Sequence, residues 1–150
     1  MPDPVRTPSA VPEPLTEADR AFPPVEAKYY KKLDGGRVEC GLCPAKCRVA
    51  DRERGACGVR ENRDGVYYTL IHSRVASAHV DPIEKKPLFH FLPGTTAFSL
   101  ATPGCNMACT FCQNWEISQF RPKQIDCQKL TPAQVAPLAK RWGCPTVTFT

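Results

Sequence analysis

The sequence predicts an α/β fold, and three consecutive segments near its carboxyl end lead to that prediction. Residues 96–102 read as a buried strand, residues 131–141 as a helix, and residues 145–150 as a second strand. Strand, helix and strand at this spacing form one βαβ unit, whose crossover we expect to be right-handed. Upstream of this unit the chain divides by composition into an arm (1–26), a cysteine-rich segment (27–64) and a connecting segment (65–95).

The boundaries of the βαβ unit follow from local signals. The first strand is an apolar run that Pro103-Gly104 stops. Thr131 fits the residue that caps a helix, with Pro132 at the first helical position. We expect the helix to stop at Gly143 and to be kinked or shortened by the proline at position 137.

The first 26 residues predict a disordered arm. Seven of the sixteen prolines of the chain fall there, among serine, threonine and acidic residues, and periodic apolar positions are absent. A mitochondrial presequence would be rich in arginine and poor in acids, which this arm is not. Because no apolar run approaches the length of a membrane span, we expect a cytoplasmic protein without a membrane contact.

Four cysteines in the segment 27–64 indicate a metal site. A C-x2-C pair and two later cysteines give a closed set of ligands, which suits a structural zinc or a fully coordinated iron–sulfur cluster. Disulfides and free thiols are the alternatives, but no secretory signal is visible, so a reducing compartment is expected. The segment is rich in Gly and Pro and would need a metal for order. The four candidate ligands are Cys40, Cys43, Cys47 and Cys57.

A second group, Cys105, Cys109 and Cys112, has the spacing C-x3-C-x2-C and directly follows the first predicted strand. A cubane cluster has four irons and normally takes four cysteines, so three thiolates leave one iron open for a small molecule. The aromatic Phe111 precedes the last cysteine, where it could shield a cluster from water. Three buried thiols are one alternative, and a zinc site with a fourth ligand from elsewhere is another.

The C-x3-C-x2-C motif with an aromatic residue before its last cysteine resembles the signature of radical S-adenosylmethionine enzymes. Residues 113–118 look like the branch related to the activating enzymes of pyruvate formate-lyase. Residues 81–94 are similar to the radical enzyme of the AmmeMemoRadiSam group, which is named for its association with AMMECR1-like and Memo-like proteins. The resemblance covers residues 33–150.

The resemblance implies a 4Fe–4S cluster on Cys105, Cys109 and Cys112 whose open iron chelates S-adenosylmethionine. Reductive cleavage would give methionine and a 5′-deoxyadenosyl radical that abstracts hydrogen from an unknown substrate. It also implies an electron donor such as flavodoxin or ferredoxin, and AMMECR1-like and Memo-like proteins as candidate partners. The fold it implies is a partial (βα)6 TIM-like barrel, of which residues 96–150 would be the first part. We therefore expect this chain to be an incomplete fragment that does not by itself turn over S-adenosylmethionine.

Residues 65–95 are expected to be ordered. Residues 65–71 and 74–80 are rich in β-formers and are expected to pair as a hairpin. The apolar stretch 87–92 is expected to pack onto the entrance of the barrel.

Two other classes of function remain open. The chain could be a noncatalytic electron-transfer module with two metal sites, or a zinc-stabilised interaction protein that uses a basic face. The net charge is +5, but no nucleic-acid motif accompanies the basic residues, so nucleic acid is an unlikely partner. Cys127 and Cys144 have no companions at ligand spacing and are interpreted as structural.

Overall fold

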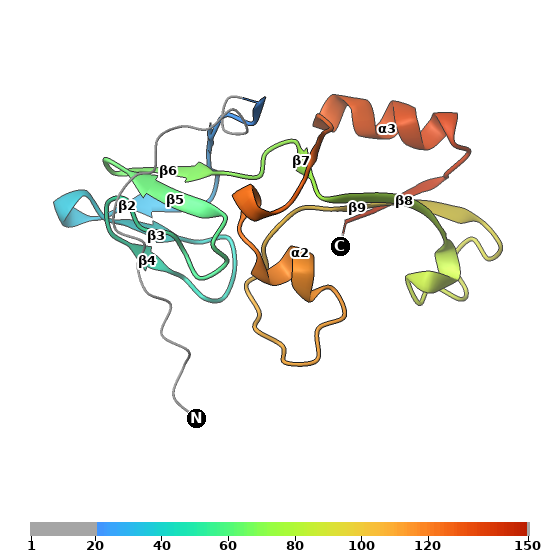
Figure 1. Ribbon diagram of the computed structural model, residues 1–150, viewed down its shortest axis with the longest axis horizontal. Coiled ribbons are helices and arrows are strands. Elements are labelled where there is room, and N and C mark those ends of the chain that lie inside the picture. Colours follow the sequence, from blue (N-terminus) through green and yellow to red (C-terminus); the bar gives the residue numbers. More distant parts are fainter. Residues whose placement is uncertain (1–20, 150) are drawn as a thin grey trace. The chain divides into compact units, whose positions relative to one another are not determined.

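The computed structural model describes residues 21–149 (Figure 1). The chain divides into two compact units between Leu70 and Ile71. Most of the arm that was expected to be disordered lies outside the described residues. Its last two residues form strand β1 (Val25–Glu26), because their backbone pairs with a later strand of the first unit.

The first unit consists of two small antiparallel sheets. One has the strand order β1-β6-β5 and the other the order β2-β3-β4. A short 3-10 helix, η1 (Asp34–Gly36), connects the first two strands of the second sheet. The strands are β2 (Tyr30–Lys32), β3 (Val38–Cys40), β4 (Arg48–Val49), β5 (Arg60–Arg63) and β6 (Val66–Thr69).

The hairpin predicted for residues 65–71 and 74–80 is wrong, because β6 pairs backward with β5. The turn between these strands is Asp64-Gly65, and both residues have positive φ, 52° and 77°. Positive φ at both central residues is the requirement of a type I′ turn, whose twist matches that of the strands it joins. Asp-Gly is a strong signal for such a turn, so the correct hairpin was readable from the sequence.

The second unit is built around strand β9 (Thr96–Ala101), which pairs with a neighbour on each side. Strand β8 (Ser77–Pro82) is antiparallel to it, and β11 (Thr146–Phe149) is parallel to it. A separate two-stranded sheet joins β7 (Arg74–Val75) to β10 (Gln128–Lys129). The helical elements are η2 (Ile83–Lys85), α2 (Trp115–Gln119), η3 (Pro122–Gln124) and α3 (Pro132–Arg141).

The predicted strand–helix–strand pattern is confirmed within this unit. Helix α3 connects the parallel strands β9 and β11 and begins where predicted, with the Gln134 side chain accepting hydrogen bonds from the backbone N–H and hydroxyl of Thr131. The helix continues through Pro137 and ends just before Gly143, whose φ is 67°. Its Ala139 packs in a core with Val75, Phe98, Leu100 and Cys144.

The predicted barrel is wrong. Within residues 21–149 every sheet has only two or three strands, most pairings are antiparallel, and none of the sheets closes on itself. A barrel of this kind requires consecutive parallel strands, but β8 occupies one side of β9 in the antiparallel sense. The local βαβ signal therefore specified one parallel pair and not the architecture around it.

The apolar stretch 87–92 does not pack onto a barrel entrance either. It follows η2 in a loop, and its large side chains are substantially exposed, with Phe89 at 61% and Phe91 at 53% of their accessible surface. The prolines that bound it and the lack of regular structure leave its apolar side chains without a common face.

The charged run before this stretch has a structural role that the sequence did not reveal. Asp81, which is buried at the end of β8, accepts hydrogen bonds from Lys85 Nζ at 2.8 Å and Lys86 Nζ at 3.0 Å. The hydrogen bonds from Lys85, Ser99 and Lys86 hold the pKa of the Asp81 carboxyl well below its usual range. This contact fixes the turn of η2 against the end of the central sheet.

The lowered pKa of Asp81 predicts acid sensitivity of the second unit. A carboxyl whose folded pKa is depressed contributes stability that is fully present above its unfolded pKa, about 3.9, and is lost as pH falls through the folded pKa. Asp81→Asn should cost about 1–3 kcal/mol at neutral pH and should lose less stability than the parent chain on acidification to about pH 3, since only the carboxyls with lowered pKa that remain, such as Glu84, would still respond. Chemical denaturation of both chains at the two pH values measures this. An undiminished acid response in the variant would contradict the assignment to Asp81.

Candidate functional site

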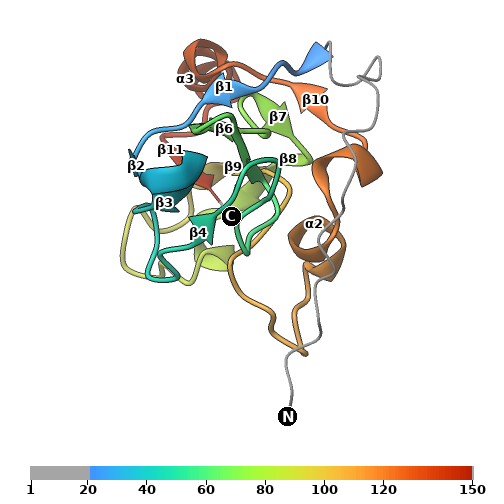
Figure 2. The same ribbon diagram turned by 90° about the vertical axis from the view of Figure 1, so that its left-hand side faces the viewer.

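The loop that carries Cys105, Cys109 and Cys112 leaves the end of β9 and leads into α2. It extends on the side of the β8–β9 strands opposite to α3, as both views of the molecule show (Figures 1 and 2). Its two ends are tied by a hydrogen bond from Gly104 N–H to the Ile117 carbonyl at 2.7 Å. The Gln119 side chain donates to the carbonyl of Met107 at 3.1 Å. The loop is therefore closed at its base and held by α2.

The three cysteines of this loop are free and partly exposed. The Met107 N–H donates to the sulfur of Cys105 at 3.4 Å. The sulfur of Cys112 lies 3.5 Å from the Ser118 hydroxyl, and the Cys112 N–H donates to the carbonyl of Cys109 at 3.4 Å. Hydrogen bonds to sulfur of this kind stabilise thiolate ligands and tune the potential of an iron–sulfur cluster.

The donor set of the loop fits an iron–sulfur cluster in its chemistry, because it offers three soft, uncrosslinked thiols within one closed loop. The sulfurs are not, however, positioned to hold a cluster in this structure. Nowhere in the described part of the chain are three or more His, Cys, Asp or Glu side chains gathered into a group that could hold a metal. The loop would have to draw its sulfurs together when a cluster binds, as is common where metal binding and ordering are coupled.

Phe111 does not cover the cysteines in this structure. Its side chain is 87% exposed, and Met107 within the loop and Trp115 just after it are also more than half exposed. Trp115 packs edge-on against Phe120, with the ring centroids 5.4 Å apart. The loop thus presents an apolar surface that nothing in its own unit covers among the described residues.

The upstream cysteines lie in the turn between β3 and β4, or next to it, and in the loop before β5. Cys40 ends β3 and Cys47 precedes β4, and the Cys40 N–H donates to the Cys47 carbonyl at 2.9 Å. Cys43 lies in the turn between these strands, and Cys57 lies in the loop before β5. All four are free of disulfides, and the Ala56 N–H donates to the sulfur of Cys47 at 3.4 Å.

A buried arginine contacts this group. Arg60, on β5, is only 6% exposed, and its Nη1 donates to the sulfur of Cys40 at 2.7 Å. Its Nη2 donates to the Lys28 carbonyl, and its guanidinium lies over the ring of Tyr67, 4.9 Å from the centroid. No carboxylate of residues 21–149 forms an ion pair with Arg60. Of the groups that Arg60 contacts, the thiol of Cys40 is the one that can ionise and carry a full negative charge.

Tyr67, on β6, is fully buried, and its hydroxyl has no hydrogen-bond partner. Burial raises the pKa of Tyr67 far above its usual value, and the nearby Cys40 and Cys57 raise it further. Cys47 adds to this effect, and Arg60 opposes it. The hydroxyl lies beside Gly55, where an added Cβ would be 2.7 Å from its oxygen and 3.7 Å from the sulfur of Cys47, so Tyr67 is part of the surroundings of the upstream cysteines.

Sequence reasoning missed Tyr67, and it did not distinguish Arg60 from the other basic residues of the cysteine-rich segment, which could stabilise a thiolate cluster or form a solvated face. The four residues of β5 alternate in burial, which turns Arg60 and Asn62 inward. Arginine is rarely buried unless it is paired with a carboxylate, and the sequence around Arg60 shows no pattern that would predict such a pair. Its burial could therefore not be predicted from the strand alone. Recognition of the Asp64-Gly65 hairpin would have placed β6 beside β5 and Tyr67 near the cysteines.

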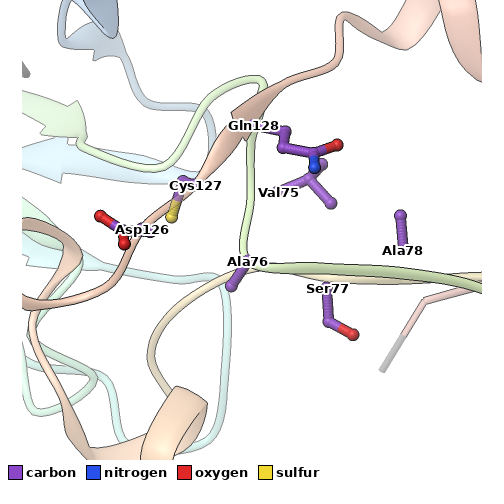
Figure 3. A pocket seen from close by; sticks show the side chains of 7 residues that line it. All are labelled: Val75, Ala76, Ser77, Ala78, Asp126, Cys127 and Gln128. Atoms are coloured by element: carbon purple, nitrogen blue, oxygen red, sulfur yellow. The ribbon is translucent and has the colours of Figure 1, made fainter.

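Two hollows of the second unit are lined by residues that belong to neither cysteine group. One, of about 340 Å³, is mostly apolar and is lined by residues of β7, β9, α3 and β11. The other, of about 200 Å³, includes Cys127 beside Asp126 and faces Ala76 and Ser77 (Figure 3). Burial raises the pKa of the Cys127 thiol, which keeps it protonated and unreactive. Cys144 is buried in the core, so the structural interpretation suits both residues.

Comparison with known proteins finds two relatives in Methanocaldococcus jannaschii. The uncharacterized protein MJ0808 is 48% identical over 125 residues, which is 83% of this chain and 38% of that protein. The uncharacterized protein MJ0674 is 31% identical over 105 residues, which is 67% of this chain and 26% of that protein. The chain thus spans well under half the length of each relative. No protein-family model matches the chain. No solved structure matches it either.

None of the helices in residues 21–149 is long and apolar enough to cross a membrane.

The contacts of Arg60 predict that it is more than a charged surface residue. Arg60→Lys should lower the free energy of unfolding by about 2–3 kcal/mol, because one ammonium group cannot reproduce the forked contacts to Cys40 and Lys28. Urea denaturation under reducing conditions measures the loss. Arg48→Lys is the matched control, since Arg48 forms only an exposed ion pair with Glu39 and should change stability by no more than about 0.5 kcal/mol. Equal effects of the two substitutions would rule out a special role for Arg60.

Proposed function

We propose that this chain is part of a radical S-adenosylmethionine enzyme in which Cys105, Cys109 and Cys112 hold a 4Fe–4S cluster. The observation that carries the proposal is the placement of three free cysteines, at C-x3-C-x2-C spacing, in a closed loop directly after the buried strand β9. When bound, the cluster would supply the electron that divides S-adenosylmethionine into methionine and a 5′-deoxyadenosyl radical.

The other residues of the loop have supporting roles in this proposal. The Met107 N–H and the Ser118 hydroxyl lie within hydrogen-bond distance of the sulfurs of Cys105 and Cys112, so they would stabilise bound thiolates. The hydrogen bond between Gly104 and Ile117 would keep the loop closed while its sulfurs gather. No protein thiolate remains in the loop for the fourth iron, which leaves that position for the amino and carboxylate groups of S-adenosylmethionine.

The proposed chemistry requires a site that excludes water, and the exposed cysteine loop does not provide one by itself. A reactive radical must be kept from solvent, whereas Phe111 is exposed. We assign to Phe111 the shielding of the cluster once S-adenosylmethionine and the rest of the whole protein are in place. The exposed loop is also accessible to an electron donor such as flavodoxin or ferredoxin. AMMECR1-like and Memo-like proteins remain proposed partners of the whole protein.

The proposal predicts a cluster that depends on one cysteine group. Anaerobic reconstitution of the chain should give iron and sulfide and a paramagnetic reduced state. Replacing Cys105, Cys109 and Cys112 together by Ser should abolish that signal, because too few thiolates would remain in the loop. Cys127→Ser, in the same unit, should leave it unchanged. An unaltered spectrum in the triple variant would show that the cluster lies elsewhere or does not form.

The activity test follows 5′-deoxyadenosine under anaerobic conditions with a strong reductant, in this chain and in the longer relative MJ0808. We expect product from the longer protein and little from this chain, because cleavage requires the sulfonium to be held against the cluster. Absence of product from both proteins, each carrying a full cluster, would favour a noncatalytic iron–sulfur module.

A further inference from the structure

We propose a structural zinc site in the first unit, held by the four upstream cysteines and supported by two buried side chains. The ligands are the thiolates of Cys40, Cys43, Cys47 and Cys57. Arg60 and Tyr67 are positioning residues: Arg60 already donates to the sulfur of Cys40, and the Tyr67 hydroxyl would donate to a ligand sulfur once the metal is bound. The site lies entirely within residues 21–70, so it does not depend on the function proposed for the loop of the second unit.

The first observation is the orphaned hydroxyl of Tyr67. A buried hydroxyl without a partner costs free energy, and native proteins rarely leave one unexplained. This hydroxyl points at Gly55, where an added Cβ would lie 2.7 Å from the oxygen and 3.7 Å from the sulfur of Cys47. Metal-bound sulfur is anionic and accepts hydrogen bonds well. A ligand set gathered at this point would give the hydroxyl the acceptor that it lacks.

The second observation is the buried charge of Arg60. A buried guanidinium requires a compensating negative charge, and no carboxylate of the described residues supplies one. Its Nη1 instead contacts the sulfur of Cys40. A zinc ion with four thiolates carries a net charge of about −2. That negative charge, delivered in part through Cys40, matches the cation that is already in place.

The backbone around the ligands also brings two of them together and donates a hydrogen bond to one ligand sulfur. Cys40 and Cys43 begin a turn between β3 and β4, and Lys46 in that turn has a φ of 41°, in the left-handed region. The turn brings Cys47 back beside Cys40, where their backbones are hydrogen-bonded. The Ala56 N–H already donates to the sulfur of Cys47. Supporting hydrogen bonds of this kind orient ligands in metal sites.

Two features favour a structural metal at this site. We assign a single zinc ion, and an iron–sulfur cluster on the same four thiolates is the alternative that analysis of iron and sulfide distinguishes. Four thiolates form a closed tetrahedral set, which leaves no position for a substrate. The unit also has little apolar core, which consists of Ala27, Val38, Cys40, Val49 and Tyr67, so a crosslink through a metal would add order that packing cannot. Because the four side chains do not form a metal-holding group in the described structure, binding should draw their sulfurs together.

The test measures metal content by elemental analysis. In the chain with Cys105, Cys109 and Cys112 replaced by Ser, about one zinc ion per chain should remain, without iron or sulfide. Adding Cys43→Ser and Cys57→Ser to that background should remove it. Iron and sulfide in the triple variant, no metal at all, or zinc retained after the further substitutions would each overturn the zinc site. Absence of metal, or zinc retained after the further substitutions, leaves the cluster test of the second unit untouched. Iron and sulfide in the triple variant would instead place an iron–sulfur cluster at the upstream cysteines, and the loop cluster would then be tested by the difference in iron content between the parent chain and the triple variant.

A second measurement addresses the positioning residues in chains that keep every ligand. Tyr67→Phe in the same background should lower zinc affinity about tenfold and shift the visible spectrum of the cobalt-substituted chain, because one hydrogen bond to a ligand sulfur is lost. Tyr68→Phe is the matched control and should change neither, since the neighbouring ring faces Arg63 instead. Identical affinity and spectra in the two variants would refute the role of Tyr67.

Discussion

Strand β9 is the constraint on which the second unit depends. Five of its six residues are buried, and it pairs with β8 on one side and β11 on the other. Phe98 lies at its centre, edge-on against Trp142 with the ring centroids 4.8 Å apart, so it ties the strand to the end of α3. The end of this strand sets the position of the cysteine loop, because the chain forms no other regular element between β9 and α2.

The first unit relies on buried polar contacts where the second relies on apolar packing. Asn62 is fully buried and donates to the carbonyls of Gly36 and Val49, while its own oxygen accepts from the Gly65 N–H. These contacts fix the β5–β6 hairpin against the neighbouring sheet. Arg60 and Tyr67 belong to the same arrangement, but the Tyr67 hydroxyl has no hydrogen-bond partner and Arg60 pairs with no carboxylate of the described residues. Polar groups in a small core restrict the structure to one arrangement only when all their partners are present. This is the physical reason that a metal at the upstream cysteines would matter.

The two cysteine groups differ in how the protein holds them. The loop of the second unit is closed at its base, but its sulfurs are partly exposed and its aromatic neighbours face solvent. In the upstream group Cys40 is buried and contacts a buried cation, whereas Cys43, Cys47 and Cys57 are partly exposed like the cysteines of the loop. The two groups therefore differ in the side chains around the sulfurs and not in the exposure of the sulfurs. Exposed aromatic neighbours suit a site that must admit a small molecule and an electron donor, whereas a buried arginine and a buried tyrosine suit a site that stabilises a fold.

Local signals in the sequence determined the elements that depend on neighbouring residues. Thr131 and Pro132 set the start of α3 and Gly143 set its end, because capping and φ preferences act within a few residues. The two cysteine groups were likewise identified by spacing alone. Tertiary structure decided everything that depends on pairing across long distances. It placed β8 antiparallel to β9 and so excluded the barrel, and it turned Arg60 and Tyr67 toward Cys40 and Cys47. Such choices are made by the competition between strands for the same edge and by burial of particular faces, which no local pattern encodes.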